Sequence, residues 1–243
     1  MVSSPVASVT RLLNPITSIA LLISMRSLFR VLSVSLMLAC VPAAQAQTAS
    51  TAADRQTVLV VGDSLAAEYG LARGSGWVPL LARRLSEQYP NYQVVNASIS
   101  GDTTSGGTAR LPGLLKRHTP AVVVLELGSN DALRGLPLSM TENNLAAMTQ
   151  AAKGAGAKVL IVGMQIPPNY GRDYTERFAR VFQAVAQKEG VSLTPFLMEG
   201  MATDRELFQA DGIHPNEKAQ PTLLNNVWPG LKPLLRGDQP SAG

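Results

Sequence analysis

A serine and a histidine in this 243-residue chain each stand in a setting that suits acyl transfer. Ser64 lies in the run Gly-Asp-Ser-Leu at positions 62–65, and His214 follows Asp211 by three residues. A serine hydroxyl is a weak nucleophile until a neighbouring base accepts its proton. An aspartate just before the histidine can reach round a turn and hold the imidazole in the required tautomer. We therefore predict a catalytic triad of Ser64, His214 and Asp211.

The other histidine of the chain, His118, is a poor candidate for the base. It follows Lys116 and Arg117 and precedes an expected strand, so we place it on the solvated surface at the opposite edge of the sheet. An Asp-x-x-His pair also occurs at the start of a helix, here with Asn216 as the capping residue. The pair at 211–214 therefore indicates a catalytic role only in combination with the other polar loops.

Acyl transfer also needs hydrogen-bond donors aimed at the negatively charged oxygen that forms on attack. Three candidates are the backbone N–H of Ser64, the backbone N–H of Gly101 and the side-chain amide of Asn130. Taken singly, Gly101 also fits an ordinary turn, and Asn130 an ordinary loop cap. Taken together, they predict an oxyanion hole formed by Ser64, Gly101 and Asn130.

Short apolar runs precede these polar residues and predict buried strands. The runs cover residues 58–61, 92–97, 121–127, 158–162 and 191–196. Continuous apolar runs favour strands that are buried on both faces. Helical patterns lie between them, such as the i, i+3, i+4, i+7 spacing of Phe178, Val181, Phe182 and Val185. This alternation predicts a parallel sheet covered on both faces, and such sheets bind ligands at the carboxyl ends of their strands.

The chain resembles the GDSL, or SGNH, hydrolase family, named for its serine, glycine, asparagine and histidine. Gly-Asp-Ser-Leu at 62–65, Gly-Ser-Asn-Asp at 128–131 and Asp-Gly-Ile-His-Pro at 211–215 match the family's blocks in order and spacing. Further stretches at 95–103, 109–112 and 168–171 resemble a bacterial periplasmic subgroup, and the likeness covers about residues 57–235. The resemblance implies a three-layer α/β/α sandwich, flavodoxin-like, with a five-stranded parallel sheet.

The resemblance also implies roles and substrates. Ser64 is then the nucleophile, His214 the general base and later the acid, and Asp211 the residue that orients the imidazole. Asp63 is expected to hold the catalytic residues in place rather than to react itself, and we interpret Glu126 as a paired structural carboxylate. The expected substrates are small acyl thioesters, aryl esters and lysophospholipids, hydrolysed by a monomer that uses no metal and no cofactor.

Two loops, 66–77 and 132–140, are expected to flank the site. Their apolar residues predict an acyl groove lined by Leu71, Trp77, Leu133, Leu136, Leu138 and Met140. Local packing is an equally good interpretation of each of these residues. The acyl-chain length of the substrate therefore stays open at this point.

Alternative functions differ in what they require of the sequence. An ordinary α/β-hydrolase would carry its serine in Gly-x-Ser-x-Gly, which this chain lacks. A dinucleotide loop is suggested only by Gly154-Ala155-Gly156, which precedes a strand and lacks a third glycine, so we interpret it as a helix stop. A carbohydrate acetylesterase of the same fold and a non-catalytic binding module stay as alternatives to an esterase or thioesterase.

Composition argues against a nucleic-acid partner and against a disulfide framework. The net charge of +4 falls to +1 without residues 1–46, which hold three arginines and no acid. A nucleic-acid surface would need a basic patch on the folded part of the chain. The single cysteine, Cys40, excludes an intramolecular disulfide.

The N-terminal residues predict export. Met25 to Ala46 combine a short positive stretch, an apolar run at 31–41 and small residues before a cleavage point after Ala46. That apolar run is shorter than the roughly 18 residues that span a membrane. We expect residues 1–46 to be an extension and signal peptide, 47–55 a linker, 56–236 one hydrolase domain and 237–243 a disordered tail, in a periplasmic or secreted protein. For residues 1–24 we favour translation from Met25, and lipid attachment at Cys40 is a less favoured alternative to simple cleavage.

Overall fold

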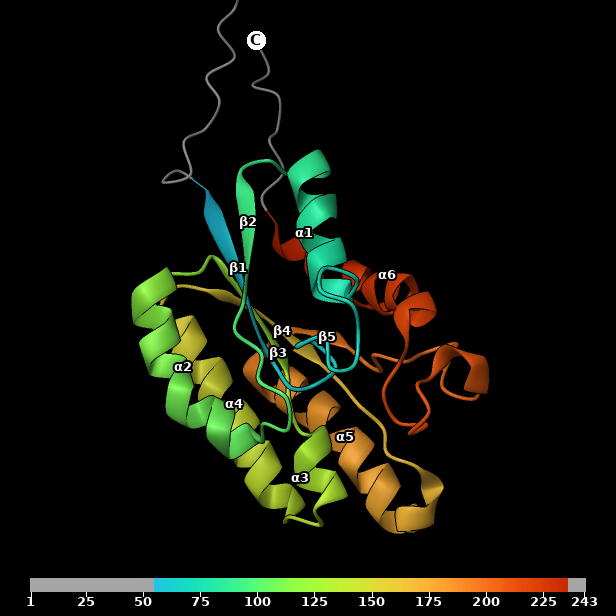
Figure 1. Ribbon diagram of the computed structural model, residues 1–243. Coiled ribbons are helices and arrows are strands. Elements are labelled where there is room, and N and C mark those ends of the chain that lie inside the picture. The colour runs from blue at the N-terminus through green and yellow to red at the C-terminus, as the bar shows by residue number, and fades with distance from the viewer. Residues whose placement is uncertain (1–54, 236–243) are drawn as a thin grey trace, which may run out of the picture. The chain divides into compact units, whose positions relative to one another are not determined.

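The computed structural model describes residues 55–235, and a five-stranded parallel sheet forms their centre (Figure 1). Its strands are β1 (Gln56–Gly62), β2 (Tyr92–Asn96), β3 (Val122–Glu126), β4 (Lys158–Val162) and β5 (Ser192–Thr194), in the order β2-β1-β3-β4-β5. All four pairings between neighbours are parallel. The sheet predicted from the five apolar runs is confirmed.

Burial on both faces explains why the strands are apolar throughout rather than at alternate positions. All five residues of β3 are buried, as are the last six residues of β1. The two strands pair in register, with Val60 opposite Val124 and Gly62 opposite Glu126. β-Branched side chains pack well on such a pleated, crowded surface, so the valine-rich composition and the central position of these strands agree.

The fifth strand is shorter than its apolar run because Pro195 follows Thr194 and has no N–H for the ladder. The chain after β4 still lies close to this segment, since the Gly163 N–H donates to Thr194 O at 2.8 Å. A Cβ on Gly163 would lie only 2.3 Å from Pro195 O. Glycine is therefore required where the two segments approach each other.

Helices cover both faces of the sheet and complete the expected three-layer α/β/α sandwich (Figure 1). On one face, α1 (Trp77–Gln88) packs beside α6 (Gln220–Leu231). On the other face lie α2 (Thr104–His118), α4 (Leu138–Gly154) and α5 (Arg172–Glu189), with α4 in contact with both of its neighbours. The short helix α3 (Ser129–Leu133) follows β3, and 3₁₀ turns occupy Pro168–Tyr170, Arg205–Leu207, Glu217–Ala219 and Lys232–Leu234.

The carboxyl ends of all five strands lie at the same edge of the sheet, and the connecting loops begin there. Residues 63–76 leave β1 there, 97–103 leave β2, and α3 begins shortly after β3. The segment 195–219 runs from the end of β5 towards α6 and carries Asp211 and His214. Parallel strand direction therefore brings the four polar loops of the sequence to the same edge.

Several sequence predictions fall on residues that the structure does not describe. The extension and signal peptide at 1–46, nearly all of the linker at 47–55 and the tail at 237–243 lie outside residues 55–235. The domain boundaries stay predictions for that reason. Across residues 55–235, no helix is both long and apolar enough to cross a membrane.

Two glycines of α2 allow a test of how closely this helix packs. A Cβ on Gly107 would lie 2.4 Å from Leu127 Cδ1 and 2.9 Å from Met148 Sδ, whereas a Cβ on Gly113 would meet nothing within 4 Å. Alanine raises helix propensity at either position. We expect Gly107→Ala to be less stable to urea unfolding than Gly113→Ala by about 1–3 kcal/mol, the usual cost of overpacking. Equal stability of the two variants would contradict tight packing at Gly107.

Candidate active site

The predicted nucleophile and base meet at the carboxyl edge of the sheet. His214 Nε2 lies 2.9 Å from Ser64 Oγ, and His214 Nδ1 lies 2.7 Å from Asp211 Oδ2. In the tautomer that suits both contacts, Nδ1–H donates to the carboxylate and Nε2 accepts from the serine hydroxyl. A continuous hydrogen-bonded chain thus runs from the hydroxyl through the imidazole to the carboxylate.

Asp211 is held by its own loop as well as by the imidazole. Its Oδ1 accepts the backbone N–H groups of His214 at 3.0 Å and Ile213 at 2.9 Å. These two backbone hydrogen bonds, and after them the imidazole, lower the pKa of Asp211 to about 2. Asp211 therefore stays a carboxylate at neutral pH, and it fixes the orientation of the imidazole ring.

Two further residues hold the imidazole in place. The ring of Tyr69 lies against His214, with the ring centroids 4.5 Å apart at an interplanar angle of 40°. Gln209 joins the two loops, because its backbone N–H donates to His214 O at 2.8 Å and its Nε2 donates to Tyr69 O at 2.8 Å. Sequence reasoning missed Gln209, since a lone glutamine in a loop carries no signal of such a contact.

The donors of the predicted oxyanion hole come from two loops and from the start of α3. In the described part of the chain, the backbone N–H groups of Ser64 and Gly101 have no hydrogen-bond acceptor. Asn130 lies at the start of α3, and its Nδ2 donates to Asp102 O at 2.9 Å and to Asp63 Oδ2 at 3.1 Å. Asn130 is thereby fixed between the loop of Ser64 and the loop of Gly101.

Gly62 shows why the serine turn begins with glycine. A Cβ at this position would lie 2.6 Å from Glu126 Oε2 and 2.9 Å from Ala66 Cβ. Any side chain would push the turn away from β3, to which Gly62 is paired. The first residue of the Gly-Asp-Ser-Leu run is therefore required by packing against Glu126 and Ala66 rather than by chemistry.

Two carboxyl groups lie buried close to Ser64. Asp63 and Glu126 are both fully buried, and Glu126 Oε2 accepts the Asp63 N–H at 3.3 Å. Burial raises the pKa of Asp63 to about 6, although its Oδ1 accepts the Leu65 N–H. Burial, and after it the charge of Asp63, raises the pKa of Glu126 well above its ordinary value. The folded enzyme therefore holds protons on both carboxyl groups at pH values at which the same side chains in water would be ionised.

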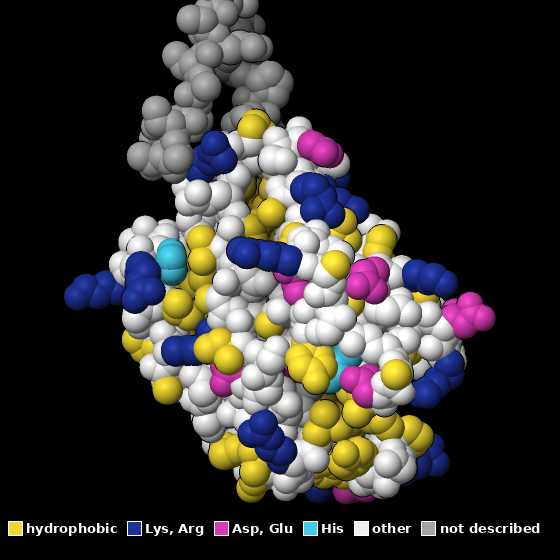
Figure 2. Space-filling view, viewed as in Figure 1, with side chains coloured by type: hydrophobic (Ala, Val, Ile, Leu, Met, Phe, Trp, Pro, Cys, Tyr) yellow, Lys and Arg dark blue, Asp and Glu magenta, His cyan; other side chains and the backbone are white. Residues whose placement is uncertain are grey.

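A cavity of about 630 Å³ opens beside Ser64 and His214. Ser64, Asn130 and His214 form part of its wall, and hydrophobic side chains form most of the rest: Leu65, Leu133, Met164, Ile166, Pro167, Pro168, Tyr170, Phe196, Met198, Ala202, Phe208 and Ile213. Figure 2 shows hydrophobic side chains gathered round a hollow on this side of the molecule, over the region where Figure 1 places the segment after β4. An apolar chain attached to a carbonyl at Ser64 would fit such a cavity.

The predicted acyl groove is only partly correct. Leu133 lines the cavity, but Leu71, Leu136, Leu138 and Met140 do not. The prediction is also wrong for Trp77, because this residue begins α1 and is completely buried in the core between that helix and the sheet. Most of the wall comes instead from segments after β4 and β5. Their position after strands of the same sheet is the signal that could have identified them.

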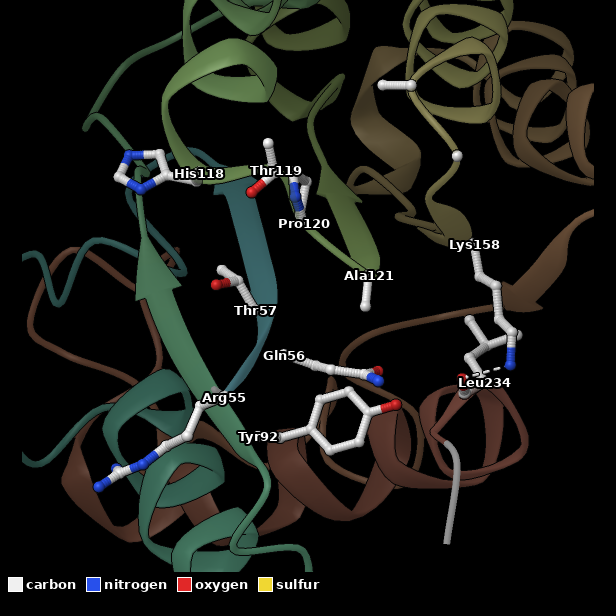
Figure 3. Close-up of a pocket in the computed structure, with 12 residues that line it drawn as sticks. Arg55, Gln56, Thr57, Tyr92, His118, Thr119, Pro120, Ala121, Lys158 and Leu234 are labelled. Atoms are coloured by element: carbon white, nitrogen blue, oxygen red, sulfur yellow. Dashed lines mark hydrogen bonds between the residues drawn. The ribbon is translucent and has the colours of Figure 1, made fainter. Parts of the chain in front are cut away.

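A second cavity, of about 430 Å³, lies at the opposite edge of the sheet (Figure 3). His118 lines it beside the start of β1, and Lys158 points to Leu234 O, to which its Nζ donates at 2.7 Å. No serine and no carboxylate belongs to its wall, as far as residues 55–235 show. The position of His118 agrees with the prediction that it is remote from the base.

Comparisons with known proteins place this geometry in a family. Residues 60–220 match the model of the GDSL-like Lipase/Acylhydrolase family. Esterase TesA of Pseudomonas aeruginosa is 57% identical over 180 residues, covering 74% of this chain and 90% of that protein. Thioesterase 1/protease 1/lysophospholipase L1 of Escherichia coli K12 is 42% identical over 187 residues, covering 77% of this chain and 88% of that protein.

Solved structures agree with the sequence matches. The crystal structure of TesA covers 74% of this chain and all of its own, with a TM-score of 0.72. That of the psychrotrophic esterase EstA from Pseudoalteromonas, inhibited by monoethylphosphonate, is 37% identical, covers 73% of this chain and 97% of its own, and has a TM-score of 0.70. The chain belongs to the GDSL-like lipase/acylhydrolase family, and it is an ester-hydrolysing enzyme.

The buried carboxyl pair predicts an unusual dependence of stability on pH. Because the folded state holds protons on Asp63 and Glu126 that the unfolded chain releases near their ordinary values of 3.8 and 4.5, the free energy of unfolding falls as pH rises above about 4. The decrease amounts to at most about 1.4 kcal/mol per pH unit for each proton. We expect Glu126→Gln, which keeps an oxygen acceptor, to weaken this decrease in urea unfolding measured from pH 5 to pH 8.

The matched control is Glu176→Gln, because Glu176 lies on α5 with its side chain 48% exposed. This variant should follow the wild-type pH dependence. Asp211 does not interfere with this measurement. Because its pKa is lowered, its stabilising contribution is lost only as pH falls below about 4, outside the range measured. A Glu126→Gln variant with the wild-type slope would show that Glu126 is already ionised in the folded enzyme.

Proposed function

We propose that the enzyme hydrolyses carboxylic esters and acyl thioesters, including lysophospholipids, through a Ser64–His214–Asp211 triad. One observation carries the proposal: a serine hydroxyl lies 2.9 Å from an imidazole nitrogen whose partner nitrogen lies 2.7 Å from a carboxylate. Each distance is that of a hydrogen bond, and the sequence of groups is the one that activates a serine. The names of the relatives, esterase and thioesterase/lysophospholipase, support the same chemistry.

The reaction proceeds in two acyl transfers. Ser64 Oγ attacks the carbonyl carbon while His214 Nε2 accepts the hydroxyl proton, which gives a tetrahedral intermediate. His214 then donates that proton to the departing alcohol or thiol, and an acyl-serine remains. Water, deprotonated by the same imidazole, then attacks the acyl-serine. The bond between the acyl carbon and Ser64 Oγ breaks, His214 returns the proton to Ser64 Oγ, and the carboxylic acid is released.

The intermediate carries its negative charge on the former carbonyl oxygen. The N–H groups of Ser64 and Gly101, which have no acceptor among the described residues, can donate to this oxygen, and Asn130 lies in the wall of the cavity beside Ser64. Both hydrogens of Asn130 Nδ2 already have acceptors, Asp102 O and Asp63 Oδ2. The oxyanion must therefore share the hydrogen that Asn130 donates to Asp63, at the longer of the two contacts.

The apolar cavity favours fatty acyl groups over acetyl groups. Its walls include Met164, Phe196 and Met198, and an acetyl group would fill little of the roughly 630 Å³. A carbohydrate acetylesterase would instead need polar groups for the sugar on the leaving-group side. The relatives of this chain include an esterase and a thioesterase, so a non-catalytic binding module is the poorer interpretation. We therefore rank the esterase or thioesterase above the acetylesterase.

Export remains part of the proposal. It rests on the segment Met25 to Ala46, which the structure does not describe, and on its match to the pattern of a signal peptide. Intact-mass analysis of protein recovered outside the cytoplasm should give a chain that begins at Gln47. A chain that retains Met25 would contradict cleavage.

Removal of the proposed nucleophile should nearly abolish turnover. We expect Ser64→Ala to lower kcat for p-nitrophenyl esters by about 10³–10⁶-fold and Asn130→Ala by about 10²–10³-fold. Ser86→Ala serves as the control, because Ser86 lies on α1 and its hydroxyl bonds only to Arg83 O at 2.7 Å. Near-normal turnover by folded Ser64→Ala protein would refute the mechanism.

The cavity predicts how rate depends on acyl length. Each methylene that enters an apolar pocket contributes about 0.8 kcal/mol, or roughly fourfold in kcat/KM. We expect kcat/KM to rise from acetate towards medium-chain p-nitrophenyl esters, until the cavity is full. Met198→Trp should lower kcat/KM for the longer esters and leave kcat/KM for the acetate ester within about twofold. The larger side chain takes up cavity volume without touching the triad. A maximum at acetate in the wild type would favour the acetylesterase.

A further inference from the structure

The guanidinium of Arg110, on α2, contacts three separate segments of the carboxyl edge. Its Nε lies 2.7 Å from Asp102 Oδ2, its Nη2 donates to Gly62 O at 3.4 Å, and its Nη1 donates to Ala97 O. Gly62 ends β1, Ala97 follows β2, and Asp102 precedes α2. One side chain therefore connects the end of β1, the end of β2 and the loop that leads into α2.

Each of these segments leads directly to a proposed oxyanion donor. Gly62 precedes Ser64 by two residues, and Asp102 follows Gly101. The backbone oxygen of Asp102 also accepts Asn130 Nδ2 at 2.9 Å, so the residue that Arg110 binds through its carboxylate orients the third donor through its carbonyl. Each of the three donors thus lies within two residues along the chain, or one further hydrogen bond, of a residue that this guanidinium contacts.

We propose that Arg110 is a positioning residue that sets the spacing of the three oxyanion donors and so acts on the transition state without touching substrate. The proposal rests on the proposed function, because it assigns a role within that oxyanion hole. Arg110 is absent from the wall of the cavity beside the triad, so a direct contact with the acyl group does not account for it.

The chemistry of arginine suits this role. A guanidinium is planar and presents donors in fixed directions, so it holds three acceptors in a defined relative geometry. The side chains of Arg110 and Asp102 are only 19% and 12% exposed, which weakens the screening of their charges by water. A lysine at this position would offer one ammonium on a flexible stem and could not hold all three acceptors with the same geometry.

A structural role and a positioning role make different kinetic predictions. Loss of an interaction that operates only in the transition state lowers kcat and leaves KM nearly unchanged. General destabilisation instead lowers the amount of folded enzyme and leaves the kcat of each folded molecule as it was. The split between kcat and KM, measured on folded protein, therefore separates the two.

The experiment uses Arg110→Met, Arg110→Lys and the control Arg84→Met on p-nitrophenyl butyrate. Arg84 is also half-buried and also has specific contacts, with Asn225 Oδ1 at 2.9 Å and with the ring of Trp228 at 5.0 Å, but it lies on α1. We expect Arg110→Met to lower kcat about 10- to 100-fold with KM within about twofold, Arg110→Lys to recover part of that loss, and Arg84→Met to keep wild-type kcat.

Two further readouts test whether Arg110 acts through the oxyanion hole. Inhibition by an acyl trifluoromethyl ketone, whose serine adduct carries an oxyanion, should weaken in Arg110→Met by about the same factor as kcat/KM. In an Asn130→Ala background, Arg110→Met should lower kcat by less than about a further threefold, because the effects of residues that act as a unit are not additive. Unchanged kcat in folded Arg110→Met, or losses that multiply in the double variant, would overturn the proposal.

Failure of this proposal is distinguishable from failure of the proposed function. If Ser64→Ala is inactive while Arg110→Met is fully active, only the role of Arg110 is wrong. If Ser64→Ala stays active, the mechanism itself is wrong, and with it the role of Arg110. Should Arg110→Met fail to fold, Arg110→Lys tests the same role: a lowered kcat with weaker ketone inhibition supports it, and wild-type values of both overturn it.

Discussion

The hydrogen bond between Ser64 Oγ and His214 Nε2 joins two residues that lie 150 positions apart in the chain. Such a contact exists only if the first and last parts of the domain are fixed at the same place. The parallel sheet does this, because every strand from β1 to β5 points its carboxyl end to one edge. The buried valine and leucine side chains of β1 and β3 therefore determine the geometry of the site, although none of them takes part in the chemistry.

The loops at this edge are held by polar contacts that the sheet does not supply. Gln209 connects the loop of His214 to the loop of Tyr69, and Asn130 connects the loop of Ser64 to that of Gly101. Asp131, fully buried next to Asn130, accepts the Thr104 N–H at 2.9 Å and fixes the start of α2 against α3. Donors that are fixed before the reaction need no reorganisation when the oxyanion forms, and this preorganisation is a large part of catalysis by such sites.

The strands and the proximity of Ser64, His214 and Asp211 could be predicted from the sequence, because both depend on local signals. Runs of valine define the buried strands, and the Asp211–His214 spacing fits a turn whose backbone N–H groups bind the aspartate, as the structure shows. The wall of the cavity could not be predicted in the same way. Trp77 is the clearest example. It lies four and eight residues before Leu81 and Leu85 on α1, so it shares their buried face and packs in the core rather than in the cavity wall.

Residues that act through long-range contacts are harder to identify from the sequence. Arg110 lies in the stretch 109–112 that contributes to the family resemblance, but only the folded structure shows that its guanidinium meets Gly62, Ala97 and Asp102. Glu126 is similar: its burial follows from β3, but its proximity to the Asp63 N–H depends on the register between β1 and β3. Sequence patterns identify the groups that do chemistry more readily than the groups that position them.

Transfer of the Ser64 proton to His214 is the central claim of the mechanism, and the rate of serine phosphonylation measures it most directly. An alkyl fluorophosphonate should label Ser64 in the wild type, located by peptide mass, and His214→Ala should lower the labelling rate by about 10³-fold or more while the fold stays intact. A His214→Ala variant that is labelled at the wild-type rate would contradict the account, because the hydroxyl would then be activated without the imidazole.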